Sequence, residues 1–391
     1  MRAFRPGLFS LIFLIRRCML RPFILPAAKP AQSTRVFLRA VLKGVFMSRI
    51  TDLGIDLGTS NVLIYGRNRG IIFKAPAVIA LNRDTNAVIA IGEDAHKMLG
   101  RAPGSIIVKR PLKGGIAGKN LALVGAMLLH FVIEANGKHI FQGPRVIMSV
   151  PPALNETERR AITASLFESG ARRTQIISRP IAAALGADLP IGETYGEMIV
   201  DIGGSITDIA VISMGACVIN ESIPIGGDSF DEAIIRYVRR KHNLLIGEIT
   251  AEEIKTRIGS VMPRRDPLYL DITGRDLLSG LPKTLRITSD EVLEALDDPL
   301  QELIEVIHSV LERTPAELAA DIFDTGIVFS GGGALLEGLS DAVSIALKIN
   351  CRIADSPQEC IARGCGLTME KFNEYSRYLV SSRKKNRGAQ R

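Results

Sequence analysis

The sequence predicts an α/β protein of at least two domains that share a duplicated core. Three observations carry this prediction. The chain has 391 residues, enough for two domains with large cores. Short apolar strands alternate with helical segments along most of it. One local pattern, an apolar strand, an Asp-x-Gly turn and a second apolar strand, occurs twice, about a domain's length apart.

The first copy of this pattern is GIDLGTSN, residues 54–61. Its turn holds Asp56 and Gly58, and the apolar residues 62–65 (VLIY) follow it, so a β-hairpin is expected. Such a turn offers backbone N–H groups and hydroxyls to a phosphate, and a carboxylate to a hydrated magnesium ion. Because the same pattern also makes an ordinary hairpin, both interpretations stay open on this stretch alone.

The second copy is EMIVDIGGSIT, residues 197–207, followed by another apolar strand. Two such turns suggest an internal duplication in which both turns face a common phosphate. A third glycine-rich stretch, SGGG at 330–333, follows an apolar strand and is expected to open a helix over 334–347. A strand, a glycine run and a helix start form a site for the phosphate or ribose of a nucleotide.

Several helices are predicted from local signals. Asn155 and Thr288 each precede a glutamate by three residues, the pattern of a capping box. Residues 91–100 also read as a helix. The segments 180–185 and 360–372 are rich in small residues, which lets a helix pack closely against a neighbour.

The net charge of +8 is concentrated at the two ends of the chain. Residues 1–46 hold nine Lys or Arg and residues 381–391 hold five, with no acidic residue in either segment, so the remainder carries a net charge of −6. A nucleic-acid-binding domain carries its positive charge on the folded body, so no nucleic-acid partner is expected. The five cysteines lack metal-binding spacing, which favours reduced thiols in a cytosolic protein.

The N-terminal extension has a possible membrane-binding helix. Its apolar stretch 7–15 is too short to span a bilayer and is interrupted by arginines, which makes a poor signal peptide. Residues 35–47 place basic residues at every fourth position beside two apolar rows, the pattern of a helix that lies in a membrane interface. A start of translation at Met47 is the alternative. Ile140 and Phe141 are expected in a basic loop. They are either buried core residues or a second membrane anchor.

Taken together and in order, these motifs resemble those of the actin-like ATPase superfamily. GIDLGTSN and VDIGGSITD are similar to its two phosphate loops, VFSGGGALLEGL to its adenosine loop, and the helices near 161–186 and 360–372 to its connecting segments. The resemblance runs from about Leu53 to Phe372. It is most similar to the MreB branch of bacterial actins, through ESIPIGGDSFDEAI, AEEIKTRIG and SGGGALLEGL.

The resemblance implies an actin-like (ribonuclease H-like) two-domain fold, with a duplicated βββαβα core and a nucleotide cleft between the domains. Each domain would have a large and a small subdomain. The implied boundaries are 1–46 for the N-terminal extension; 47–79, 122–192 and 361–380 for the large subdomain of domain I; 80–121 for its small subdomain; 193–228 and 294–360 for the large subdomain of domain II; 229–293 for its small subdomain; and 381–391 for a basic tail.

The implied ligand is ATP with Mg²⁺, and Asp56 would hold the metal through water. No catalytic residue is assigned. The residues that the resemblance implies for nucleotide binding are Thr59, Ser60, Asn61, Gly203, Gly204, Ser205, Glu252, Glu253, Ile254, Lys255, Gly331, Gly332, Gly333 and Ala334.

The resemblance also implies a function. Family members polymerise into filaments on the inner face of the cytoplasmic membrane, where they help to determine cell shape by organising cell-wall synthesis. The implied partners are further copies of the chain, the membrane, and the cell-wall elongation machinery with its membrane adaptors. The implied location is cytoplasmic and peripheral to the membrane. Two alternatives remain: a non-polymerising paralogue that acts as a regulator, and a soluble kinase of the same superfamily.

The sequence departs from the family pattern at positions that concern ATP hydrolysis. Where the family usually has two glutamates before the first connecting helix, this chain has Ser178 and Arg179. Arginine offers only donors and cannot take a proton from water. The second phosphate loop has Ser205 in place of a glycine, and Gly114 and Gly118 replace aspartates. We therefore predict slow or absent hydrolysis. In the alternative, another carboxylate, Asp208 or Glu197, takes the place of the missing glutamate.

Overall fold

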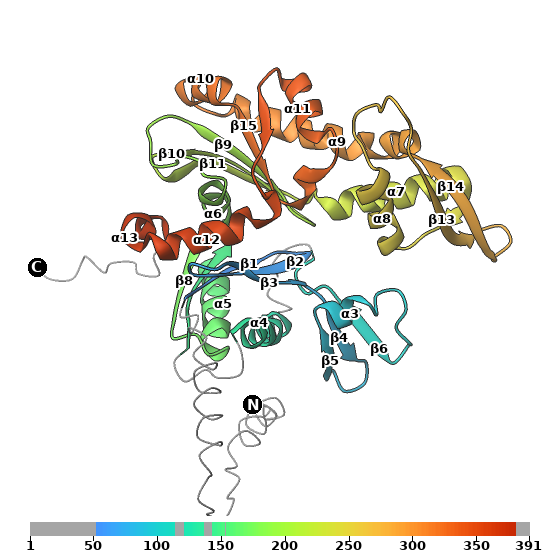
Figure 1. The fold of residues 1–391 in the computed structure, drawn as a ribbon, viewed down its shortest axis with the longest axis horizontal. Helices are drawn as coiled ribbons and strands as arrows, with labels where there is room; N and C mark the ends of the chain where they lie inside the picture. The colour runs from blue at the N-terminus through green and yellow to red at the C-terminus, as the bar shows by residue number, and fades with distance from the viewer. Residues whose placement is uncertain (1–51, 114–120, 137–142, 153, 381–391) are drawn as a thin grey trace, which may run out of the picture. The chain divides into compact units, whose positions relative to one another are not determined.

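The computed structural model describes residues 52–113, 121–136, 143–152 and 154–380, all of which belong to one compact unit (Figure 1). Several predictions fall outside the described residues: the N-terminal extension with its stretch 35–47, Gly114 and Gly118, Ile140 and Phe141, and the tail 381–391. No helix within the described residues is long and apolar enough to cross a membrane.

The first large sheet has five strands in the order β3-β2-β1-β7-β8. The first three are antiparallel, and β7 and β8 add parallel strands beside β1. The predicted hairpin is confirmed, since Leu57 pairs with Val62 across the turn. β1 is central and buried along its whole length, with Leu53, Ile55 and Leu57 in the hydrophobic core. The strands are β1 (Asp52–Leu57), β2 (Asn61–Gly66), β3 (Gly70–Pro76), β7 (Arg145–Val150) and β8 (Arg173–Ser178).

The second large sheet repeats this topology in the order β11-β10-β9-β15-β16. Again three antiparallel strands come first in the chain, and two parallel strands follow beside the central one. The repetition agrees with the internal duplication predicted from the two turns. The strands are β9 (Glu197–Ile202), β10 (Thr207–Ser213), β11 (Ala216–Ile223), β15 (Ile327–Ser330) and β16 (Cys351–Ile353).

Two smaller sheets of three strands each are inserted between these elements. The predicted helix over 91–100 is wrong in length: α3 covers only Glu93–His96, and turns follow it up to residue 101. The elements of the first insertion are β4 (Ile79–Asn82), β5 (Val88–Ile91), α3 and β6 (Ile106–Lys109). Those of the second are α7 (Gly227–His242), β12 (Leu244–Leu245), α8 (Glu248–Ile258), β13 (Tyr269–Asp276) and β14 (Pro282–Thr288).

Both predicted capping boxes are present, at Asn155 with Glu158 and at Thr288 with Glu291. They satisfy backbone N–H groups that the first helical turn leaves unpaired. The predicted helix over 334–347 is broken: the first turn ends at Leu335 because Leu336 is extended (ψ 122°), and Gly338, in a left-handed conformation (φ 78°), precedes the next helix. These helices are α4 (Leu121–Asn136), α5 (Glu156–Glu168), α9 (Ser289–Glu312), α10 (Ala316–Thr325), η2 (Gly332–Leu335) and α11 (Leu339–Leu347).

Helices α6 (Arg179–Gly186) and α12 (Cys360–Glu370) pack against each other between the two large sheets (Figure 1). Their glycines make the close approach possible: a Cβ on Gly186 would lie 1.7 Å from the carbonyl oxygen of Cys360. Apolar side chains of both helices share one buried cluster with residues of both sheets, such as Ile147 and Ile199. This pair is therefore the packed joint between the two halves. After it come α13 (Phe372–Tyr375) and η4 (Ser376–Tyr378), and η3 (Pro357–Glu359) precedes it.

Candidate nucleotide site

A cavity of about 420 Å³ lies between the two halves of the described unit. Ligand sites in proteins typically have volumes of about 300–1,000 Å³, so the cavity has room for a nucleotide-sized molecule. The turn β1–β2, the turn β9–β10, helix α8 and the glycine run after β15 all contribute to its wall. The predicted site residues that line it are Asp56, Thr59, Ser60, Asn61, Gly203, Gly204, Glu252, Lys255, Gly331, Gly332 and Gly333.

The two Asp-x-Gly turns meet directly. The backbone N–H of Ser205 donates to Thr59 Oγ1 at 3.0 Å. Gly204 approaches the first turn so closely that a Cβ there would lie 1.9 Å from Ser60 Oγ. The duplication therefore brings the two turns to one point, as the sequence predicted. Ser205 itself does not line the cavity: its side chain is buried and turned toward Asp228.

Three other predicted residues also lie away from the cavity wall. Glu253 is exposed and forms an ion pair with Arg257 at 2.7 Å. Ile254 and Ala334 are fully buried in the hydrophobic core. On a helix successive residues point about 100° apart, so Glu252 and Lys255 face the cavity while the two residues between them do not.

Lys255 is held in place by the start of helix α7. Its Nζ donates to the carbonyl oxygen of Gly227 and to Asp231 Oδ2, both at 2.9 Å. Burial raises the pKa of Asp231 to about 6, and Lys255 opposes this shift. The lysine thus presents a fixed positive charge at the side of the cavity that α8 forms.

A cluster of charged side chains forms the other side of the cavity. Asp56 and Arg179 both line it and are both buried. Burial raises the pKa of Asp56 to about 6, against the pull of Arg179. For Arg179, burial acts to lower the pKa, but the surrounding aspartates raise it by more. The pKa of the guanidinium therefore lies above its ordinary value, and the group stays charged.

Neither carboxylate considered as a replacement for the missing glutamate lines the cavity. Asp208 lies 3.2 Å from Arg179 Nε and accepts a hydrogen bond from Ser222. Glu197 is buried at the far end of β9, where it pairs with Ile212. Both residues therefore belong to the framework around the site.

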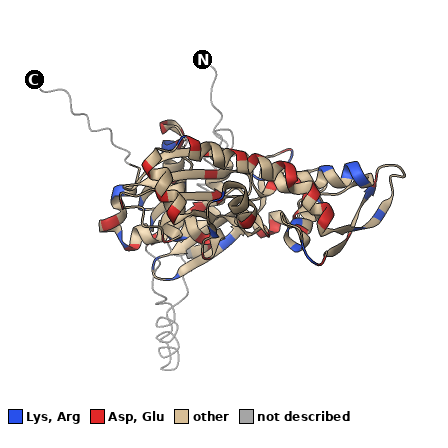
Figure 2. Cartoon of the chain, turned by 90° about the horizontal axis from the view of Figure 1, so that it is seen from above, with Lys and Arg blue, Asp and Glu red and all other residues tan. Residues whose placement is uncertain are grey.

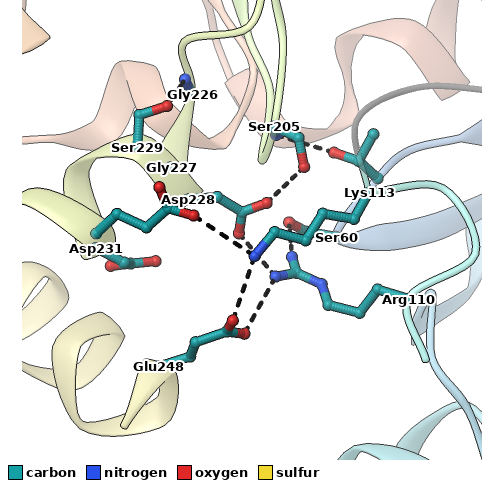
Figure 3. A network of polar contacts seen from close by, with 12 residues as sticks. Ser60, Arg110, Lys113, Ser205, Gly226, Gly227, Asp228, Ser229, Asp231 and Glu248 are labelled. Atoms are coloured by element: carbon teal, nitrogen blue, oxygen red, sulfur yellow. Dashed lines mark hydrogen bonds and ion pairs between the residues drawn. The ribbon is translucent and has the colours of Figure 1, made fainter. Parts of the chain in front are cut away.

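Sequence reasoning missed a set of polar contacts beside the cavity, which it meets at Ser60 (Figure 3). Arg110 donates to Asp228 at 2.7 Å and to Ser60 Oγ at 3.0 Å. Ser205 Oγ also donates to Asp228, and Lys113 donates to Glu248 at 3.2 Å. We call these six residues the polar latch. Asp228 lies in the stretch ESIPIGGDSFDEAI that carries part of the family resemblance, and nothing local in the sequence indicates its pairing with Arg110.

The comparisons with known proteins agree with this architecture. The family model described as MreB/Mbl protein matches residues 50–377. The cell shape-determining protein Mbl of Bacillus subtilis (strain 168) is 42% identical and covers 84% of this chain and 99% of its own length. The cell shape-determining protein MreB of Escherichia coli (strain K12) is 42% identical, with coverages of 87% and 98%.

A solved structure shows the same fold. The crystal structure of MreB 5 of Spiroplasma citri bound to AMPPNP superposes with a TM-score of 0.78 at 34% identity, and covers 83% of this chain and 97% of that one. The predicted actin-like two-domain fold is thereby confirmed. The family match extends over most of the chain, including both Asp-x-Gly turns and the glycine run that line the cavity. The chain is accordingly a member of the MreB/Mbl protein family.

Proposed function

We propose that this chain is an ATP-binding bacterial actin homologue that polymerises into filaments on the inner face of the cytoplasmic membrane. There it helps to determine cell shape by organising cell-wall synthesis with the elongation machinery and its membrane adaptors. The observation that carries the proposal is the cavity in which two facing turns meet a glycine run. Relatives named for cell-shape determination and a structural neighbour bound to AMPPNP support it.

The residues around the cavity suit the parts of a nucleotide. Thr59 and Ser60 bring hydroxyl groups that suit phosphate oxygens, and Gly203 and Gly204 have no side chain that would keep a phosphate away from the second turn. The glycine run at 331–333 leaves room for close approach of a nucleoside. On this proposal the phosphates lie between the two turns and the nucleoside lies toward α8.

Magnesium fits at one point. Asp56 Oδ1 accepts a hydrogen bond from Ser149 at 3.1 Å, and no hydrogen bond among the described residues reaches Oδ2. Within the same residues no group of three or more His, Cys, Asp or Glu is arranged to hold a metal directly. We therefore propose that Asp56 holds a hydrated ion through water. When bound, such an ion neutralises phosphate charge.

We also propose that hydrolysis is weak. Arg179 occupies the place where the family pattern has a glutamate, and its guanidinium is already paired with Asp201 and Asp208. A protonated arginine cannot act as a general base, and loss of a general base typically lowers the rate by a factor of about 10²–10⁴.

Polymerisation with slow turnover is the first expected result. With ATP the purified chain should sediment and form filaments in electron micrographs, while phosphate release from the same sample stays at least about 100-fold below that of the Escherichia coli relative. Arg179→Glu should raise that release. A chain that binds ATP but never sediments would be a non-polymerising regulator, and turnover equal to the relative would contradict weak hydrolysis.

Membrane binding rests on the sequence of residues 35–47 and on Ile140 and Phe141. Full-length protein should float with liposomes that contain anionic lipid, and the chain that starts at Met47 should float less. If removal of residues 1–46 together with polar substitutions at 140 and 141 leaves flotation unchanged, the membrane part of the proposal is wrong.

The polar latch should slow the release of nucleotide. We expect Arg110→Met to speed ATP dissociation roughly tenfold, because it removes a partly buried charged hydrogen bond between the halves. Stopped-flow release of a fluorescent ATP analogue measures this rate. Lys113→Met is the matched control: its ion pairs are more exposed, so its effect should stay within a factor of a few. Equal rates for Arg110→Met and the unchanged protein would contradict a role for the latch.

A further inference from the structure

Arg179 lies at the centre of three buried aspartates. Its Nη2 donates to Asp201 Oδ2 at 3.3 Å, and its Nε lies 3.2 Å from Asp208 Oδ2. Asp201 and Asp208 face each other across the antiparallel pair β9–β10, and Asp56 attracts the guanidinium from the end of β1. The side chain of Arg179 is 9% exposed, so water screens this cluster little.

A serine hydroxyl donates to one oxygen of each aspartate. Ser330 donates to Asp201 Oδ1 at 2.8 Å, Ser149 donates to Asp56 Oδ1, and Ser222 donates to Asp208 Oδ1. Within the described residues, Asp56 Oδ2 is thus the one oxygen of the three carboxylates without a hydrogen bond or ion pair. A positive charge that partly compensates this cluster is therefore built into the protein.

Arg179 also reaches the part of the cavity proposed for phosphate. It lines the cavity, and a Cβ on Gly203 would lie 3.7 Å from its Nη2. A guanidinium offers several N–H donors with delocalised charge and suits phosphate oxygens as well as carboxylates. One group can therefore compensate the aspartates and face a phosphate at the same time.

We propose that Arg179 is a fixed counter-ion in the nucleotide site, and that ATP consequently binds to this chain with only weak dependence on magnesium. The proposal rests on the proposed function, because it assumes that the cavity binds ATP. Carboxylates that would otherwise attract a hydrated divalent ion interact with the guanidinium instead. Three carboxylates against one guanidinium leave a residual negative charge, so a modest benefit from magnesium remains.

The test compares ATP affinity with magnesium and with EDTA. For the unchanged chain, a fluorescent ATP analogue should bind at most about tenfold more weakly in EDTA. Arg179→Gln should widen this ratio by a further factor of about 10–100, the worth of one or two charged hydrogen bonds. Arg179→Lys keeps the charge and should stay near the unchanged chain. Arg264→Gln is the matched control, since Arg264 lines the cavity beside Glu337, away from the aspartates, and its ratio should not change.

A second measurement covers the case in which Arg179→Gln is unstable. Magnesium alone, without nucleotide, should raise the thermal unfolding temperature of this variant clearly more than that of the unchanged chain, because the variant has lost the guanidinium that compensates its aspartates. A ratio that is the same in the variant and the unchanged chain, or a steep magnesium requirement in the unchanged chain, would overturn the proposal. Absence of ATP binding in both conditions would instead refute the proposed function.

Discussion

Replacing Gly364 by alanine is expected to lower the free energy of unfolding by about 3 kcal/mol or more. Gly364 lies in α12 where this helix crosses α6, and a Cβ there would lie 1.9 Å from the carbonyl oxygen of Ala182. Backbone atoms in a buried helix cannot move aside as the end of a side chain can, so the two helices must separate. Urea unfolding followed by circular dichroism measures the loss, and ATP affinity should fall as well because α6 carries Arg179.

Gly125→Ala is the control for this experiment, since it also places a methyl group on a helix. The nearest atom to a Cβ at Gly125 is Ser165 Oγ at 3.4 Å, an ordinary contact. Alanine favours the helix over glycine by up to about 1 kcal/mol, so this variant should be as stable as the unchanged chain or more stable. Equal stability of Gly364→Ala and Gly125→Ala would show that the α6–α12 joint tolerates separation.

The parts of the fold that depend on neighbouring residues were predictable. The hairpin at residues 54–65 and the capping boxes at Asn155 and Thr288 are each specified within a few residues, and the structure confirms them. The repeated Asp-x-Gly turn also indicated the duplication, since the same local pattern produced the same sheet order twice. Where a distant residue decides, prediction was wrong: Glu337 forms a β-bridge with Ser260, and the expected helix is interrupted between Leu335 and Leu339.

The candidate site divides in the same way. Its glycines and hydroxyls follow from short motifs, so most of the predicted residues line the cavity. The partners of the charged residues do not follow from such motifs. Arg110 contacts Asp228 from 118 positions away, and Arg179 in α6 pairs with Asp201 and Asp208 on the second large sheet. Such pairs depend on how the two halves meet. The sequence therefore indicated that Arg179 is unusual but not which residues it contacts. Figure 2 shows how Lys, Arg, Asp and Glu are distributed over the chain.

Gly331→Ala should weaken ATP binding at least about tenfold and destabilise the chain by roughly 2–5 kcal/mol. Gly331 has a φ of 83° and a ψ of 167°, a conformation open essentially only to glycine. A Cβ there would lie 2.3 Å from the carbonyl oxygen of Ile202, in the strand that leads into the second turn. The methyl group would therefore push the glycine run away from β9 and distort the wall of the cavity. Equilibrium titration with a fluorescent ATP analogue and urea unfolding measure the two effects.

The neighbouring Gly332 supplies a strict comparison, because it lines the same cavity from the next position in the chain. Its φ is not positive, and the nearest atoms to a Cβ there belong to Gln358 at 3.9 Å. Gly332→Ala should therefore unfold at nearly the same urea concentration as the unchanged chain, while Gly331→Ala unfolds much earlier. If both variants lose ATP binding without loss of stability, the run acts through contact with the ligand alone. If neither variant loses ATP binding, the glycine run is not part of the nucleotide site, because a change in a residue that contacts the ligand should weaken ATP binding.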